Sequence, residues 1–244
     1  MKSKRIIIPG ATSGIGCEIA KIYISQGWKV GIIGRRENLL KELQDLNSSN
    51  VFVQAMDINS DNATLQFQNL ITQLGGMDIY FHVSGIGYQN TQLDYAKELN
   101  TVETNCQGFT RMVTFAFNYF AEHGGGHIAA ITSIAGTKGL GVSPAYSATK
   151  RYQNQYLQCL AQLSSMRKAK IIFTDIRPGF VATDLLNDSH NYPMLMNKTD
   201  VAKAAYKAVE KKKRIKIIDW RYYFLVAAWK CIPNCIWERI SVKN

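Results

Sequence analysis

Three polar residues near the middle of the chain have the types and spacing needed for acid–base chemistry. Tyr146 and Lys150 stand four residues apart in "SPAYSATK", and Pro144 is expected to open a helix, so phenol and ammonium share one helical face. A phenol with an ordinary pKa of about 10 exchanges protons poorly at neutral pH, but an adjacent cation favours its ionised form. Ser133, in a loop expected after a strand, is placed to hydrogen-bond a substrate oxygen. A Tyr–Lys pair at this spacing also occurs as plain surface packing, so the rest of the sequence must show whether this pair is catalytic.

A glycine-rich turn near the start of the chain supplies that context. In "IIIPGATSGIG", residues 6–16, Gly10, Gly14 and Gly16 follow an apolar run. A strand, a tight turn and a helix there would present free N–H groups at a helix N-terminus, where an anion is stabilised. A pyrophosphate fits, since Gly10 permits the turn while Gly14 and Gly16 allow close approach. Glycines also cluster in structural turns, but the position after the first strand favours a dinucleotide site.

The end of the second expected strand indicates which dinucleotide binds. An acidic residue there binds the ribose 2′-hydroxyl of NAD, whereas an arginine accommodates the 2′-phosphate of NADP. The segment "GIIGRRENLL" has no carboxylate at this point but carries Arg35 and Arg36 after Gly34. We therefore predict NADP(H), preferred over NAD(H), with Arg35 as the stronger candidate. The alternative is a pair of solvated arginines that start the next helix.

The order of apolar runs predicts the fold that positions these residues. Short β-branched runs alternate with helical patterns long enough for crossovers, which indicates a parallel sheet covered on both faces. We predict an α/β fold: a Rossmann-type doubly wound sheet of seven mainly parallel strands in a three-layer α/β/α arrangement. Residues 1–219 would form the catalytic domain, and residues 220–244 an aromatic and basic extension packed on it. The expected strands are 5–10, 29–34, 51–57, 78–85, 127–133, 170–179 and 215–219.

The glycine turn, a Ser followed after twelve intervening residues by Tyr, and the YxxxK pair occur together in one known order. Over about residues 4–219 the chain resembles the short-chain dehydrogenases/reductases of the shorter-chain branch. The resemblance implies hydride transfer between a nicotinamide and a carbonyl or alcohol, with Tyr146 as general acid/base and Ser133 orienting the substrate oxygen. It also implies that Lys150 tunes Tyr146 and binds the nicotinamide ribose. Asn105 matches the family's fourth member, which anchors a water in the proton relay; alternatively, Asn105 satisfies helix backbone.

The resemblance also implies the cofactor contacts. Asp57 and the backbone after it would contact adenine, and the Val181 backbone and Thr183 hydroxyl would hold the nicotinamide carboxamide. One departure is "HVSG" at residues 82–85, where the family usually has Asn-Asn-Ala-Gly, because Val83 cannot make the hydrogen bonds of an amide. The implied contacts are Gly10, Thr12, Ser13, Gly14, Ile15, Gly16, Arg35, Arg36, Asp57, Ile58, Gly85, Tyr146, Lys150, Pro178, Gly179, Val181 and Thr183.

Two segments bear on the substrate. Residues 184–198 form a short apolar loop, which suits a lid over an apolar substrate, although ordinary packing over the cofactor explains it equally. The tail carries three of the four tryptophans, and it could enclose the pocket, contact another subunit in a homodimer or homotetramer, or lie at a membrane surface. Because Pro233 interrupts it, we predict two short helices folded back beside the loop, and place membrane contact below packing.

Composition narrows the function classes. The chain carries a net charge of +11, but residues 211–244 hold nine basic and two acidic residues, and no zinc spacing or RNA-binding motif accompanies them. We therefore expect neither nucleic-acid binding nor a metal. Five scattered cysteines indicate a reducing, cytoplasmic setting, and the run 222–229 is too short to span a membrane. The expected function is NADPH-dependent carbonyl reduction or the reverse oxidation; the alternative is a non-catalytic NADP-sensing or lipid-associated interaction protein.

Overall fold

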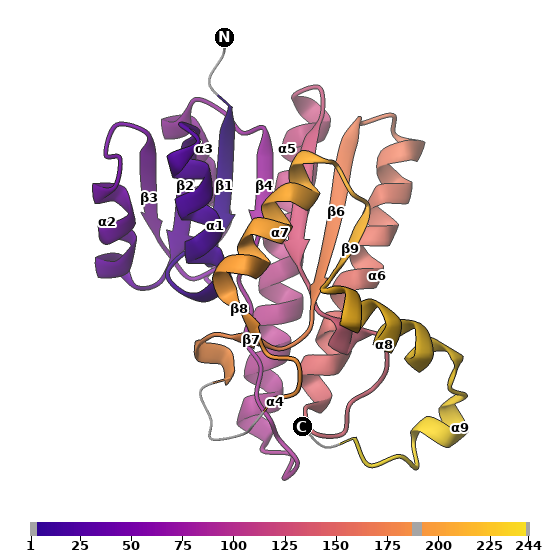
Figure 1. The fold of residues 1–244 in the computed structure, drawn as a ribbon. Coiled ribbons are helices and arrows are strands. Elements are labelled where there is room, and N and C mark those ends of the chain that lie inside the picture. Colours follow the sequence, from indigo (N-terminus) through magenta and orange to yellow (C-terminus); the bar gives the residue numbers. More distant parts are fainter. Residues whose placement is uncertain (1–3, 187–191, 243–244) are drawn as a thin grey trace.

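A computed structural model describes residues 4–186 and 192–242, and its centre is one parallel sheet (Figure 1). The sheet has seven strands in the order β3-β2-β1-β4-β5-β6-β9, all parallel to their neighbours. All seven predicted strands are present, so the predicted doubly wound fold is confirmed. The strands are β1 (Arg5–Pro9), β2 (Lys29–Gly34), β3 (Val51–Ala55), β4 (Ile79–His82), β5 (Gly126–Ile131), β6 (Ile171–Pro178) and β9 (Ile215–Ile218).

Helices cover both faces of the sheet because its strands are apolar on both sides. In β1, Ile6 and Ile8 join one buried core while Ile7, which points the other way, joins the second. The first core is covered by α1 (Gly14–Ser25), α2 (Glu37–Asp45) and α7 (Lys198–Glu210). The second core is covered by α3 (Ala63–Leu74), α5 (Phe109–Glu122) and α6 (Pro144–Met166).

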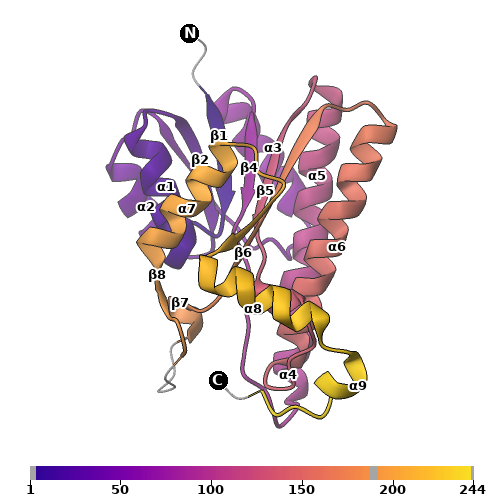
Figure 2. The ribbon, with the colours of Figure 1, turned by 45° about the vertical axis from the view of Figure 1, so that its right-hand side comes forward.

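The carboxyl ends of the strands share one edge of the sheet, and the remaining elements gather there (Figures 1 and 2). Helix α4 (Tyr95–Val102) continues through a π-helix (Glu103–Gly108) into α5, and a 3₁₀ helix (Ile134–Gly136) follows β5. A second 3₁₀ helix (Asp184–Leu186) and the two-stranded sheet of β7 (Val181–Ala182) and β8 (Met196–Asn197), which we did not predict, follow β6.

The tail forms two short helices, as predicted, on either side of Pro233. These are α8 (Trp220–Cys231) and α9 (Asn234–Trp237), and α8 crosses below the carboxyl ends of β6 and β9 (Figure 2). Tyr222 and Val226 on α8 are buried in the core that also holds α1 and α7. The tail is therefore packed against the edge of the sheet where the predicted site residues lie.

Candidate active site

Ser133, Tyr146 and Lys150 come together at the carboxyl end of β5. Ser133 caps the 3₁₀ helix that follows β5, and its Oγ accepts a hydrogen bond from Ala135 N at 3.0 Å. Tyr146 lies in the first turn of α6, with Pro144 in the helix's opening turn as expected. Lys150 follows one turn later, and its Nζ lies 5.6 Å from the centre of the Tyr146 ring. All three residues line one cavity.

Desolvation dominates the protonation of Tyr146 and Lys150. It raises the pKa of the Tyr146 phenol, and a hydrogen bond with Ser133 opposes this rise. Desolvation also lowers the pKa of Lys150 to about 8, while the charge of Asp175, and that of Cys106 when its thiol is ionised, act in the opposite direction. Burial thus outweighs the lowering expected from a neighbouring cation, and the net pKa of Tyr146 is raised. The desolvated phenol stays protonated at neutral pH, as a proton donor must be.

Asn105 lies behind the cavity wall rather than in it. The residue is fully buried in the π-helix between α4 and α5, a local widening that occurs often at functional sites. Its Oδ1 accepts from Ile86 N at 2.9 Å, while its Nδ2 donates to Ile86 O at 2.7 Å and to Thr149 Oγ1 at 3.1 Å. The side chain thus braces the loop after β4 against α6, and its predicted role in a proton relay remains a prediction.

The glycine turn has the shape that close approach requires. Gly10 has a positive φ of 89°, and a Cβ at Gly16 would overlap the Gly10 carbonyl oxygen, so helix and turn touch backbone to backbone. Ser13 is the N-cap of α1 but makes no capping hydrogen bond with its side chain. The first N–H groups of α1 thus face the cavity without a side-chain cap, an arrangement that fits a pyrophosphate.

The two arginines after β2 have different surroundings. The Arg36 guanidinium donates from Nη2 to Thr12 Oγ1 at 2.8 Å and to Ser13 Oγ at 2.7 Å, which places it against the glycine turn. Arg35 is exposed, and its Nη1 lies 3.7 Å from the carboxylate of Asp57. Arg36 therefore lies against the turn and Arg35 beside Asp57, and the sequence preference for Arg35 stays a prediction.

All the predicted cofactor contacts line the same cavity, whose volume is about 710 Å³. The glycine turn, Arg35, Arg36, Asp57 and Ile58 form one end, and Gly85, Pro178, Gly179, Val181 and Thr183 continue the wall toward Tyr146. Val83, the departure from the family pattern, also lines the cavity and packs against the first core, while its backbone N donates to Pro9 O at 3.0 Å. Donors, glycines and cavity thus fit a nicotinamide dinucleotide.

The other end of the cavity is largely apolar, and the tail forms part of its wall. Its wall includes Leu140, Met194, Leu225 and Trp229, while the Nε2 of Gln89 donates to the Tyr192 hydroxyl at 2.8 Å. The charged residues that line the cavity within the described ranges are Arg35, Arg36, Asp57, Lys150 and Asp184. None of the five belongs to the tail, so the wall that the tail supplies is uncharged.

Hydrogen bonds hold the tail at both of its ends. Tyr222 accepts from Phe180 N at 3.1 Å, and its hydroxyl reaches Pro193 O at 2.9 Å, while its ring lies against Gly179. At the far end, Trp237 Nε1 donates to Gly139 O at 2.7 Å, and Lys138 Nζ donates to Ile232 O at 2.8 Å. The tail therefore spans from the loop after β6 to the loop after Ser133. Of the predicted loop 184–198, residues 187–191 lie outside the described residues.

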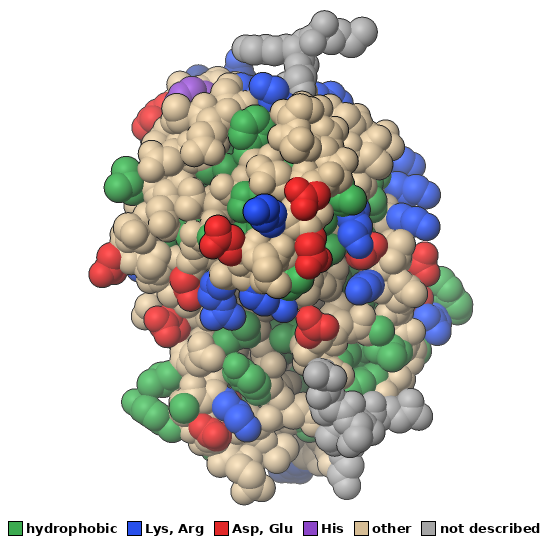
Figure 3. Space-filling model, turned by 90° about the vertical axis from the view of Figure 1, so that its left-hand side faces the viewer, with side chains coloured by type: hydrophobic (Ala, Val, Ile, Leu, Met, Phe, Trp, Pro, Cys, Tyr) green, Lys and Arg blue, Asp and Glu red, His purple; other side chains and the backbone are tan. Residues whose placement is uncertain are grey.

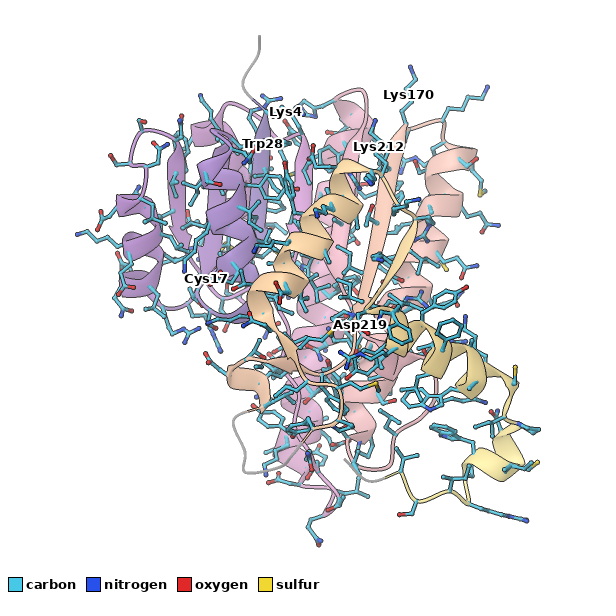
Figure 4. The ribbon with its side chains drawn as sticks, viewed as in Figure 1. Lys4, Cys17, Trp28, Lys170, Lys212 and Asp219 are labelled. Atoms are coloured by element: carbon cyan, nitrogen blue, oxygen red, sulfur yellow. The ribbon has the colours of Figure 1, made fainter. Side chains whose placement is uncertain are left out.

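The lysines at 211–213 lie away from the tail. In Figure 4, Lys212 lies toward the same end of the sheet as Lys4 and Lys170, opposite Asp219, after which α8 begins. On the face shown in Figure 3, basic and acidic side chains are interspersed. The lysines at 211–213 and the aromatic residues of α8 thus lie on separate parts of the surface. Among the described residues, no helix is long and apolar enough to span a bilayer, and no cluster of potential ligands could hold a metal ion.

The chain belongs to the short-chain dehydrogenase family, whose model matches residues 4–192. An uncharacterized oxidoreductase of Mycobacterium tuberculosis (strain CDC 1551 / Oshkosh) is 26% identical over 89% of this chain and 88% of its own length. A dehydrogenase/reductase SDR family member 7B of Xenopus tropicalis is 29% identical over 86% of this chain and 75% of its own length. The chain is thus an oxidoreductase of this family, whose fold binds a nicotinamide cofactor.

Solved structures agree on the fold. A short-chain dehydrogenase from Streptomyces avermitilis superposes with a TM-score of 0.81 at 19% identity, covering 93% of this chain and 92% of that one. A 3-ketoacyl-(acyl-carrier-protein) reductase from Brucella melitensis, complexed with NADH, superposes with a TM-score of 0.78 at 24% identity. The match covers 88% of this chain and 96% of that one.

Sequence reasoning missed one buried polar residue at this site, Gln153. It lies three residues after Lys150 on α6, and its Oε1 accepts from Lys150 Nζ at 3.0 Å. The available signal was an amide at helical spacing from the lysine.

Proposed function

We propose that this chain is an NADPH-dependent carbonyl reductase, or a dehydrogenase of the matching secondary alcohol, that acts on an apolar substrate. The observation that carries the proposal is that Ser133, Tyr146 and Lys150 line the same cavity as the glycine turn and Arg36. Asn105 would complete the tetrad from behind the wall. We further propose that residues 1–219 and the tail form one catalytic unit and, from the family resemblance, that it assembles as a homodimer or homotetramer.

The site residues would divide the chemistry of the reaction between them. A bound nicotinamide supplies the hydride that reduces the carbonyl carbon. The Tyr146 hydroxyl donates the proton that the carbonyl oxygen takes up, and its raised pKa keeps it protonated before the reaction. Ser133 Oγ accepts from Ala135 N and donates to Pro178 O over a long 3.4 Å, and we propose that its proton turns from that carbonyl to the substrate oxygen. The Lys150 ammonium stabilises negative charge that develops at Tyr146.

Arg36 supports the preference for NADPH. Its guanidinium lies on the hydroxyls of Thr12 and Ser13, beside the turn that would hold the pyrophosphate, and guanidinium groups pair well with phosphate. Asp57 is the carboxylate at the arginine end of the cavity. Its Oδ1 already accepts a hydrogen bond from Asn59 N at 2.9 Å, and its carboxylate lies near Arg35. A 2′-phosphate would thus meet cations rather than an unpaired acid.

The tail and the loop after β6 support an apolar substrate. Leu225 and Trp229 on α8, with Met194, present hydrocarbon and aromatic surface to the cavity. A substrate carboxylate would meet no cation from the tail wall, so neutral ketones or aldehydes suit it better than charged metabolites.

A turnover screen tests the proposal. Purified protein is mixed with NADPH and a panel of aliphatic and aromatic ketones and aldehydes, and NADPH absorbance is followed. We expect NADPH to be consumed fastest with the more apolar compounds. If the protein binds NADPH by calorimetry but turns over none of them, the NADP-sensing alternative is favoured. If it does not bind NADPH and instead binds liposomes, the lipid-associated alternative is favoured.

A further inference from the structure

Gln153 links two parts of the candidate site that come from different elements. The residue is fully buried on α6. Its Oε1 accepts a hydrogen bond from Lys150 Nζ at 3.0 Å, and its Nε2 donates to the backbone carbonyl of Asn105 at 2.9 Å. The amide therefore joins the ammonium of Lys150 to the backbone of the π-helix.

This link matters because Gln153 gives the Lys150 ammonium the shorter of its two hydrogen bonds to described residues. Apart from Gln153, its Nζ donates to Ile131 O, at the longer distance of 3.3 Å. Lys150 is 5% exposed, so an acceptor lost from Nζ is not readily replaced by water. A hydrogen bond that a neutral oxygen accepts from an ammonium favours its charged form.

The orientation of the amide is set by its second bond. Gln153 Nε2 donates to Asn105 O, so Oε1 faces the lysine. The Asn105 side chain is held by Ile86 and Thr149, which fixes the backbone that Gln153 contacts. Gln153 is thus braced from the π-helix and presents a preset acceptor to Lys150.

Other groups act on Lys150 from the elements around it. The charge of Asp175 on β6 favours the ammonium, as would Cys106 in the π-helix if its thiol were ionised, and Tyr146 lies on the same helix as Lys150. His82 on β4 is buried, and its pKa is lowered to about 3 by burial and by Lys150, so it stays neutral. Unlike these four groups, the Gln153 side chain accepts a hydrogen bond directly from Lys150 Nζ.

We propose that Gln153 is a positioning residue of this enzyme: its amide holds the Lys150 ammonium at the cavity wall and in its charged form. The role in the reaction rests on the proposed function of Lys150, whereas the effect on Lys150 itself does not. Without the amide oxygen, Lys150 loses its proton at lower pH and its support of Tyr146 ends earlier as pH rises.

Two substitutions that keep the size of Gln153 should shift the pKa of Lys150 in opposite directions. Gln153→Met removes the amide acceptor, and Gln153→Glu replaces it with a negative charge. The pKa of Lys150 is read by NMR titration of isotope-labelled lysine ε-carbons in the full chain, with the signal assigned by Lys150→Arg. We expect the pKa to fall by about one pH unit in Gln153→Met and to rise in Gln153→Glu. The basic limb of the pH profile of kcat/KM should move with it in each variant. The same substitutions at Gln158, which is exposed on α6, should change neither.

The outcomes separate this inference from the proposed function. An unchanged Lys150 pKa in a folded Gln153→Met variant overturns the inference, and so does a pKa that shifts while the basic limb of kcat/KM stays in place. If Gln153→Glu does not fold, Gln153→Met decides alone. If the pKa shifts as expected but the wild-type protein reduces no carbonyl compound, the proposed reaction is refuted and the effect of Gln153 on Lys150 is supported.

Discussion

At the scale of single residues, desolvation controls the chemistry that this site can perform. Lys150 is buried beside Tyr146, and its pKa falls to about 8, whereas the phenol pKa rises. Both shifts favour the neutral forms, so near neutral pH the phenol keeps its proton and the lysine retains most of its charge. This combination suits proton donation to a carbonyl oxygen.

The spacing of Tyr146 and Lys150 was predictable because four residues make about one helical turn. Their protonation was not, because the sequence shows that a cation is near but not how much water the fold removes. Gln153 escaped prediction for a similar reason. A glutamine at helical spacing is usually solvated, and only the packing of α6 against the π-helix and the sheet buries it.

Cofactor preference is a property of individual residues, and it leads to a prediction for Arg36. Arg36→Ala removes a guanidinium beside Thr12 and Ser13, so affinity for NADPH should fall by about tenfold or more while that for NADH changes little. Calorimetry with both reduced cofactors measures this, and Arg35→Ala serves as the comparison. Equal losses for NADPH and NADH would mean that Arg36 does not contact a 2′-phosphate.

At the scale of elements, long regular segments were predictable and short ones were not. The seven sheet strands appear in the sequence as apolar β-branched runs, because both faces of a parallel sheet are buried. Strands β7 and β8 have two residues each, which is too short to show any periodicity. The π-helix at Asn105 likewise has no sequence signature that separates it from the helices on either side.

Helix α8 yields a prediction because its two sides have different surroundings. Trp229 lines the cavity, whereas Phe224 is 63% exposed on the same helix. Trp229→Ala should lower kcat/KM about tenfold for the longest ketones of a homologous series and leave the shortest nearly unchanged, since we expect only the longer hydrocarbon chains to extend from Tyr146 to the tail. Phe224→Ala should leave the series as it is. A uniform loss across the series in Trp229→Ala would show that α8 does not contact the substrate.

At the scale of the whole molecule, the two cores and the tail form one packed structure. The sequence predicted a tail of two short helices folded back beside the loop, because Pro233 had to interrupt a continuous helix. It left open what covered the aromatic residues. The structure buries Tyr222, Val226 and Trp237 but leaves Trp220, Tyr223 and Phe224 exposed, a division that composition alone cannot show.

Truncation after Asp219 tests the tail as a whole. Tyr222 is 0% exposed and Val226 2% exposed, so removing them should lower the free energy of unfolding by several kcal/mol, at about 1.5–3 kcal/mol for each buried apolar side chain. Denaturant titration measures the loss, and KM for apolar ketones should rise while NADPH binding persists. A truncated protein that retains full stability and activity but loses liposome binding would identify the tail as a membrane anchor.

The most direct test of the central claim compares wild-type protein with Tyr146→Phe in NADPH turnover of a ketone or aldehyde that the wild type reduces. The substitution removes one hydroxyl from the cavity wall and leaves the ring in place. We predict that kcat falls by at least about a hundredfold, the lower range for a lost general acid. NADPH affinity and thermal unfolding should stay close to wild type. Near-normal turnover by a folded Tyr146→Phe variant would contradict the account, because the proton would then come from another group.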